Sequence, residues 1–376
     1  MALPSHVCSV DLEVCRDDSW YLLRQLVPLP PLLHLTPRIP RRHPRGQMTN
    51  SERTYVRPVD LIADALRGTD EIVAVTGATG WFGAVALDLL YEALGDHAPG
   101  RVVGYASSAR EVAVSNGRTV TVRPLVDLAS QDPPPTTLLH FAFLTRDKVA
   151  ALGVDAYTSQ NVAITATVLG AIAKHGPRNV VVMSSGAVHS RTGGLVSDLT
   201  ADPYGTLKHM DELVFRAAAR DAGGVCVIPR VFSVAGARMT KPGLYALGSM
   251  IEMARVGGPI EVRARGPVFR SYCGVDEVVA LALWAALSGR EAVFDTCGTV
   301  VEIGDLARLV AKAHGLDVDA IRRTWDPDEV PDRYVGDGRI MEELAAESGL
   351  SLSPLPVLIR QTSDWLERGP EEHATP

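Results

Sequence analysis

The 376-residue sequence predicts an α/β protein: a doubly wound parallel sheet joined to a smaller, mixed C-terminal lobe for substrate. Three observations predict this class. From Glu71 onward, short β-branched runs alternate with segments of helical periodicity. The first run, EIVAVTGATG, ends in a glycine loop directly before a helical segment. The strand-like runs are apolar throughout, which is typical of a parallel sheet covered by helices on both faces.

The alternation can be followed along the chain. The runs that predict strands are rich in Val, Ile, Leu and Phe and lie at 71–76, 101–106, 119–128, 136–143, 179–185 and 225–232. The segments with helical spacing lie at 83–94, 161–176 and 212–224. After Val234 the rhythm loosens, as in the segments 258–272, 277–287 and 356–369. We therefore predict a dinucleotide-binding domain over 48–233 and a substrate-binding lobe over 234–376, partly interleaved with it.

The first 47 residues differ from the rest in composition. They are dense in Pro, Leu and Arg, and prolines at 28, 30 and 31 interrupt the apolar stretch that a secretory signal needs. Residues 1–47 are therefore interpreted as a disordered extension, or as sequence upstream of a true start at Met48.

Charge and composition narrow the classes of partner. The net charge of −7 argues against nucleic acid and anionic membranes, and no apolar run approaches the roughly 20 residues that span a bilayer. The five cysteines are scattered and show no CxxC spacing, lying at 8, 15, 226, 273 and 297. They predict reduced thiols in a cytoplasmic protein and no metal site.

The glycine loop TGATGWFG spans 76–83, between a predicted strand and a predicted helix. In that context Gly77 permits a tight turn, Gly80 lets the backbone approach a pyrophosphate, and Gly83 lets the helix pack close to the sheet. The loop therefore predicts a dinucleotide site of the Rossmann type. Its other predicted cofactor contacts are Thr79, Trp81 and Phe82.

The end of the second predicted strand indicates which dinucleotide binds. An acidic residue there would hold the ribose of NAD, but RVVGYASSAR offers Ser107, Ser108 and Arg110 instead. Small hydroxyls and an arginine suit a 2′-phosphate. NADP(H) is therefore favoured, and NAD(H) stays open as the alternative.

A Tyr and a Lys four positions apart, Tyr204 and Lys208, would share one face of a helix. An ammonium near a phenol favours the phenolate, so Lys208 is expected to lower the pKa of Tyr204. Such a tyrosine exchanges a proton with an alcohol or a ketone while hydride moves to or from a nicotinamide. Ser185 follows the apolar run NVVVM and is the candidate hydroxyl beside them.

Together these motifs resemble a known family, the extended short-chain dehydrogenases/reductases of the NAD(P)-dependent nucleotide-sugar epimerase/dehydratase group. The resemblance covers residues from about 70 to about 367. It is carried by the glycine loop and by the segments LHFAF, SSGAV, YGTLK, IPRVFSVAG, RSYCGVDEV and RRTWDPDEVPDRYVGD.

The resemblance implies roles for individual residues. Ser185 would hydrogen-bond the reacting sugar oxygen, Tyr204 would be the acid/base, and Lys208 would tune it and hold the nicotinamide ribose. Further cofactor contacts would come from Asp127, Leu128, Phe141, Ala142 and Asn161. The substrate, a nucleotide-diphosphate sugar, would be bound by Ser185, Ser233, Arg270 and Arg323. Relatives form homodimers through the helices that begin near Asn161 and Tyr204, so a homodimer is expected.

Two neighbours of Ser185 restrict the reaction. Relatives that eliminate water from the sugar carry an Asp-Glu pair after the catalytic hydroxyl, whereas this chain has Gly186 and Ala187. Neither can act as acid or base, which argues against 4,6-dehydratase chemistry. Two reactions need only Ser, Tyr and Lys, namely 4-epimerisation and 4-keto reduction, and both stay open. Two departures from the family, Ser233 and His189, leave the sugar undefined. The alternatives are a reductase of a steroid-like or other lipophilic alcohol, and a non-catalytic NADP-binding regulatory protein.

Overall fold

The computed structural model describes residues 56–115, 117–190 and 193–372. These described residues form one compact unit. The interpretation of 1–47 as an extension concerns residues outside the described part. The division at residue 233 stays a prediction.

The predicted parallel sheet is present. Nine strands form a sheet in the order β12-β8-β6-β5-β1-β2-β4-β3, with β7 paired to β8. All pairs are parallel except β3 with β4. The strands are β1 (Val73–Thr76), β2 (Val102–Ala106), β3 (Arg110–Ala113), β4 (Thr119–Pro124), β5 (Thr137–His140), β6 (Asn179–Val182), β7 (Ser184–Ser185), β8 (Val225–Val231) and β12 (Ala292–Asp295). The α/β class with a doubly wound sheet is therefore confirmed.

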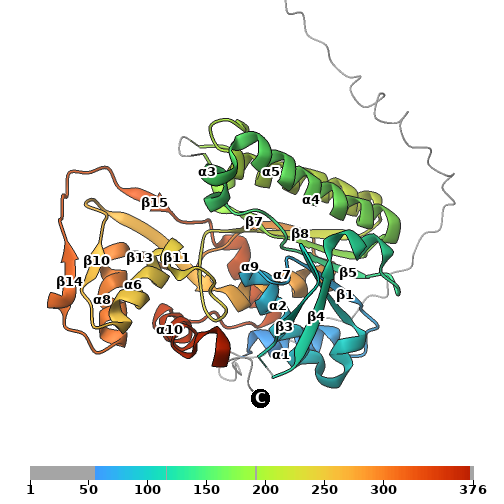
Figure 1. Cartoon of the computed structure of the whole chain (residues 1–376), viewed down its shortest axis with the longest axis horizontal. Helices are drawn as coiled ribbons and strands as arrows, with labels where there is room; N and C mark the ends of the chain where they lie inside the picture. Colours follow the sequence, from blue (N-terminus) through green and yellow to red (C-terminus); the bar gives the residue numbers. More distant parts are fainter. Residues whose placement is uncertain (1–55, 116, 191–192, 373–376) are drawn as a thin grey trace, which may run out of the picture. The chain divides into compact units, whose positions relative to one another are not determined.

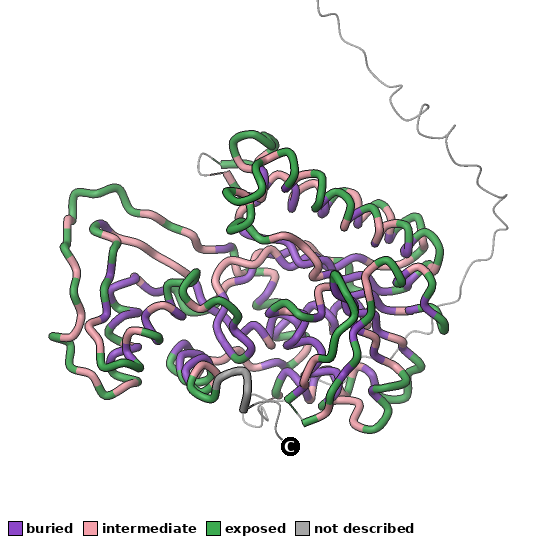
Figure 2. Tube along the Cα trace, viewed as in Figure 1, coloured by how far each residue is buried: buried purple, intermediate pink, exposed green. Residues whose placement is uncertain are grey.

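Helices cover both faces of this sheet (Figure 1). On one face lie α1 (Pro58–Leu66), α2 (Trp81–Leu94) and α7 (Val275–Leu287), which contact one another. On the other face lie α4 (Val154–His175) and α5 (Pro203–Asp221), packed side by side. Figure 2 shows α4 and α5 buried toward the sheet and exposed on their outer sides. Apolar side chains from each layer make the core, for example Leu87 on one face and Phe215 on the other.

The smaller lobe is mixed, as predicted. Strand β11 runs antiparallel to β13 and parallel to β9 and β15, while β10 pairs with β14. The lobe's strands are β9 (Ser233–Ala235), β10 (Ile260–Val262), β11 (Val268–Gly274), β13 (Thr299–Glu302), β14 (Ile321–Arg323) and β15 (Asp332–Tyr334). Its helices are α6 (Ala246–Arg255), α8 (Ile303–Ala313) and α10 (Leu355–Glu372). Helix α7 and strand β12 come after residue 233 in the chain but belong to the large sheet and its helical layer.

Several elements differ in extent from their sequence prediction. The predicted strand 119–128 ends at Pro124, because proline has no N–H to continue the ladder, and a 3-10 helix follows at η3 (Leu125–Ser130). The remaining helices are short: η2 (Gly95–Gly100), η4 (Arg146–Lys148), α3 (Val149–Leu152), η5 (Gly186–Val188), η6 (Pro242–Leu244), η7 (Val318–Ala320) and α9 (Arg339–Ser348). Within the described residues, no helix is long and apolar enough to cross a membrane.

Candidate active site

The glycine loop connects β1 to α2, and its backbone is closely surrounded. Gly77 has a φ of +68°, and a Cβ there would lie 2.6 Å from the backbone N of Ala142. A Cβ on Gly83 would lie 2.1 Å from the carbonyl oxygen of Gly77. No larger residue fits at either position, so the loop holds its turn against the segment that follows β5. Thr79 and Gly80 lie exposed at the outer edge of the loop.

These residues fit a dinucleotide. Gly80 caps α2 without a side-chain hydrogen bond, so the first N–H groups of the helix meet no side-chain acceptor from their cap. The loop lies between β2 and β5, the neighbours of β1, where the strand order reverses. Ligands of open α/β sheets bind at this point, with phosphates at the helix N-terminus. Among the residues described, no three His, Cys, Asp or Glu side chains are grouped to hold a metal ion.

The residues predicted to contact the adenosine half lie at the ends of β2 and β4. Ser107, Ser108 and Arg110 are all exposed, and Nη2 of Arg110 donates to Oγ of Ser108 over 2.9 Å. Asp127 is also exposed. The side chain of Leu128 is fully buried in the core, so its side chain does not line a cofactor site.

Ser185 and Tyr204 are brought together. Ser185 ends β7, is buried, and accepts the N–H of Ala187 at Oγ over 3.2 Å. Tyr204 is the second residue of α5, whose start is fixed by Pro203 and by the side chain of Asp202, which accepts the N–H of Gly205. Ser185 lies close enough to Tyr204 to oppose the burial-induced rise of the Tyr204 pKa. Two candidate proton-transfer groups from different elements therefore meet.

The expected lowering of the Tyr204 pKa is not found. Burial raises the pKa of Tyr204, while Ser185 and the guanidinium of Arg146 oppose that shift. Lys208 is not among the groups that shift the pKa of Tyr204. Its Nζ donates to the carbonyl of Met183 over 2.7 Å and lies 3.8 Å from the ring centre of Phe143. Tyr204 therefore keeps its proton at neutral pH.

Burial lowers the pKa of Lys208 itself to about 8, against the opposing charges of Asp211 and Glu212. Lys208 lies one turn beyond Tyr204 on α5, as the spacing predicted. The ammonium is thus close to its titration point at neutral pH.

Asn161 supports the segment that follows β5. Its Oδ1 accepts the N–H of Leu144 over 2.8 Å, and the hydroxyl of Tyr157 donates to the carbonyl of Leu144. Phe141 is half-buried, with its ring centre 6.2 Å from that of Phe82 in the glycine loop. These contacts hold the 141–144 segment beside the loop.

The predicted substrate residues occupy different surroundings. Ser233 begins β9 and is half-buried. Arg270 in β11 donates to Asp332 over 2.7 Å and lies 5.9 Å from the ring centre of Tyr334. The Arg323 guanidinium is bound by both carboxylate oxygens of Glu302 and by two backbone carbonyls. Four of the five guanidinium N–H donors of Arg323 are thus occupied by the protein itself.

Two residues that the sequence did not single out lie at the site. The hydroxyl of Tyr334, in β15, lies 3.5 Å from Oγ of Ser185. Arg146 lies 5.2 Å from the ring centre of Tyr204 and forms an ion pair with Asp202. The only signal for Tyr334 was its place in the segment RRTWDPDEVPDRYVGD. No sequence pattern pointed to Arg146.

Position 186 has no room for a side chain. A Cβ on Gly186 would lie 2.7 Å from ring atoms of Phe232. That ring is held by Tyr334, whose ring centre is 4.6 Å away, and by His189 at 5.9 Å. An acidic residue at 186 would therefore require Phe232 to move.

A segment of the smaller lobe bridges the start of α2 and the loop that follows β5. Trp81, the first residue of α2, donates its indole N–H to the carbonyl of Ala237 over 2.7 Å. From the same segment, Lys241 donates to Asp147, just beyond β5, over 2.9 Å. Arg238 anchors the segment through a bidentate ion pair with Asp88 on α2. These contacts hold the segment against α2 and the loop after β5.

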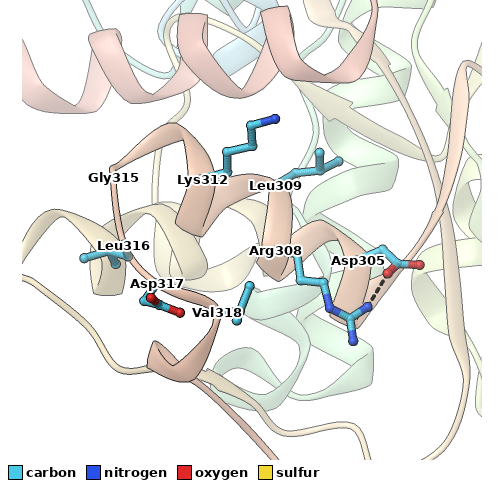
Figure 3. Close-up of a pocket in the computed structure, with 8 residues that line it drawn as sticks. All are labelled: Asp305, Arg308, Leu309, Lys312, Gly315, Leu316, Asp317 and Val318. Carbon is cyan, nitrogen blue, oxygen red and sulfur yellow. Dashed lines mark hydrogen bonds and ion pairs between the residues drawn. The ribbon is translucent and has the colours of Figure 1, made fainter.

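A separate pocket lies along α8 and the turn that follows it (Figure 3). Its lining includes none of the predicted site residues and consists of Asp305, Arg308, Leu309, Lys312, Gly315, Leu316, Asp317 and Val318. The charge of Arg308 is already paired with Asp305. This pocket is not part of the candidate active site.

The sheet, the glycine loop and the Ser185–Tyr204 pair define a dinucleotide-dependent enzyme with a hydroxyl-lined site. Residues 73–304 match the model of the NAD dependent epimerase/dehydratase family, and the chain belongs to this family. Its class is therefore that of enzymes that use a nicotinamide cofactor.

Similar proteins agree with this class. A UDP-glucose 4-epimerase of Azospirillum brasilense is 25% identical over 301 residues, covering 72% of this chain and 86% of that protein. MoeE5, solved with UDP-glucose and NAD, has a TM-score of 0.62 at 22% identity, covering 79% of this chain and 99% of its own. DesIV, a dTDP-glucose 4,6-dehydratase from Streptomyces venezuelae solved as a double mutant, has a TM-score of 0.59 at 22% identity, covering 79% and 97%. At this identity the two structures show the fold alone.

Proposed function

We propose that this protein is a nucleotide-sugar 4-epimerase that works by oxidation and reduction at one sugar carbon. The observation that carries the proposal is the Ser185–Tyr204 pair next to Gly186, a position without an acid or base where a side chain would meet the ring of Phe232. Elimination of water needs an added acid and base, whereas alcohol–ketone exchange needs a single proton-transfer group and a hydrogen-bond donor. The epimerase activity of the Azospirillum relative supports this choice.

In this proposal each side chain has one task. Ser185 hydrogen-bonds the reacting oxygen and orients it toward Tyr204. In the ionised form, which Ser185 and Arg146 favour against burial, Tyr204 would take the proton of the alcohol and return it to the ketone after the ketosugar has turned. A nicotinamide held at the glycine loop would supply the hydride chemistry. Lys208 provides positive charge within the site. Arg270 and Ser233 bind the nucleotide-diphosphate part of the substrate.

A second candidate is an NADPH-dependent 4-keto reductase. Two observations favour it. The raised pKa of Tyr204 keeps the phenol protonated, which suits proton donation to a ketone. The exposed Ser107, Ser108 and Arg110 at the end of β2 suit a 2′-phosphate.

The test separates the two candidates by cofactor and by product. The purified protein would be denatured and the released dinucleotide identified. Released NAD(H), with conversion of UDP-glucose to UDP-galactose, supports the epimerase. NADPH consumption on addition of a 4-keto nucleotide sugar supports the reductase.

The catalytic assignment is tested by Tyr204→Phe, with Tyr91→Phe as the matched control on α2. Tyr204→Phe is expected to reduce turnover about 100-fold or more, since it removes the proton-transfer group. Equal turnover of a nucleotide sugar by both variants would reject a catalytic role for Tyr204. No turnover of any nucleotide sugar by the wild type would leave the lipophilic-alcohol and non-catalytic alternatives.

We also propose a homodimer formed through α4 and α5. Exposed apolar side chains on these helices, Val162 and Leu213, support it. Sedimentation of the wild type and of Leu213→Glu tests it, with a shift toward monomer expected for the variant. A wild type that sediments as a monomer at micromolar concentration would contradict the dimer.

A further inference from the structure

The proposed reaction leaves one buried carboxylate without a task. Asp211 lies on α5, seven residues after Tyr204 and three after Lys208, so all three share one helical stripe. Its residue is 1% exposed, and Oδ1 accepts the hydroxyl of Thr165 on α4 over 2.8 Å. Oδ2 is fully buried and has no hydrogen-bond partner within the described part of the chain. A carboxylate in this state needs an explanation, because burial without partners destabilises the charged form.

The buried ammonium of Lys208 needs a negative charge to balance it. It is buried, and its two close contacts, the carbonyl of Met183 and the ring of Phe143, carry no net charge. A buried charge is stable only when an opposite charge compensates it.

Three titratable groups act on Lys208 from the elements packed around it. His140, at the end of β5, has a pKa that burial lowers to about 3, so it is neutral. Glu212 receives both a bidentate ion pair from Arg230 and a hydrogen bond from Ser184. The charge of Glu212 is therefore already balanced. Asp211 is left as the carboxylate whose charge Lys208 can balance.

We propose that Asp211 is the counter-ion of Lys208, a positioning residue that keeps the lysine protonated at the pH where the enzyme works. The two residues are three apart on one helix, where side chains are neighbours. Thr165 orients the carboxylate from the opposite helix. Asp211 touches neither Ser185 nor Tyr204 and acts only through Lys208.

The charges of the two groups depend on each other. Asp211 comes first among the groups that oppose the burial-induced fall of the Lys208 pKa, and Lys208 in turn opposes the rise of the Asp211 pKa. Removal of the Asp211 charge leaves the desolvation of Lys208 less opposed. The pKa of Lys208 then falls further below about 8.

The experiment reads the protonation of Lys208 directly. The chain has five lysines, so a protein labelled with ¹³C in lysine gives few signals, and Lys208→Met assigns the one of interest. In the wild type the Lys208 signal is expected to titrate with a midpoint near 8. In Asp211→Asn the midpoint is expected to be lower by about 1 unit.

Two further variants make the titration decisive. Asp221→Asn makes the same chemical change at the exposed end of α5 and is expected to leave the midpoint unchanged. Thr165→Val removes the hydrogen bond that stabilises the Asp211 carboxylate and is expected to lower the midpoint by a smaller amount, even if Asp211→Asn does not fold. A midpoint that is the same in wild type, Asp211→Asn and Thr165→Val would overturn the proposal.

The consequence for activity rests on the proposed function, and it is measured separately. The alkaline limb of kcat/KM for the nucleotide sugar is expected to move to lower pH in Asp211→Asn, in step with the titration, and not in Asp221→Asn. A moved titration without any nucleotide-sugar turnover would reject the proposed function and keep the counter-ion. Normal nucleotide-sugar turnover with an unchanged Lys208 titration midpoint in the variants would keep the proposed function and reject Asp211 as the counter-ion.

Discussion

The close approach of Phe232 to Gly186 makes a quantitative prediction. In Gly186→Ala, the new Cβ would lie 2.7 Å from two ring carbons of Phe232, well inside van der Waals contact. The ring cannot move freely, because Tyr334 and His189 pack against it. Overpacking of this kind destabilises a protein by about 1–3 kcal/mol. Denaturant unfolding is expected to show that loss in the free energy of unfolding, at an unchanged m-value.

A double-mutant cycle isolates the contact. In a Phe232→Ala background the added methyl has space, so Gly186→Ala is expected to change the free energy of unfolding by less than about 0.5 kcal/mol. Gly170→Ala, at a helical glycine with open space around it, serves as the matched control and is expected to be neutral or stabilising. If Gly186→Ala costs the same in both backgrounds, the steric reasoning is wrong. The argument that position 186 excludes an acidic residue would then fail with it.

Three other predictions test charges that the structure places. The pKa of Lys208 in the folded protein is about 8, below its ordinary value of 10.5, so the unfolded chain binds more protons between these two pH values. The free energy of unfolding is therefore expected to rise by about 3 kcal/mol as the pH increases through this window. Lys208→Met should abolish this rise when unfolding is measured as a function of pH. Arg238→Met should lower the free energy of unfolding by about 3–5 kcal/mol, because it leaves the largely buried carboxylate of Asp88 without its bidentate partner. A loss below about 1 kcal/mol would contradict a buried ion pair. Arg110→Ala should weaken NADP(H) binding at least about 10-fold and leave NAD(H) binding unchanged in equilibrium titration, whereas an equal loss for both would exclude a 2′-phosphate contact.

The parts of the fold that repeat a local pattern could be predicted from the sequence. The alternation of apolar runs and helical segments predicted the parallel sheet, and the glycine loop predicted its crowded β1–α2 connection, because both depend on neighbouring residues. Proline at 124 ended a predicted strand early, a local rule that the apolar pattern concealed. Helix α7 was placed in the smaller lobe by its position in the chain, although its uniformly buried surface packs against α1 and α2.

The site could be predicted only where a motif carried it. Ser185 and Tyr204 come from segments 19 positions apart with recognisable sequences, and Ser185 lies close enough to act on the pKa of Tyr204, while their catalytic roles stay predictions. Tyr334 approaches Ser185 from 149 positions away, through the pairing of β15 with β11, and no local pattern reports such a pairing. The helical spacing of Tyr204 and Lys208 could not predict where the Lys208 ammonium lies, because its position depends on contacts with Phe143 and the carbonyl of Met183.

The product formed from a nucleotide sugar tests the central claim most directly. The purified protein would be incubated with UDP-glucose and the released cofactor species, and the product would be examined by mass spectrometry and NMR. A Ser185–Tyr204 site without an acid or base at 186 predicts a product of unchanged mass with the hydroxyl at C4 inverted. A product lighter by one water would show elimination and would contradict the account.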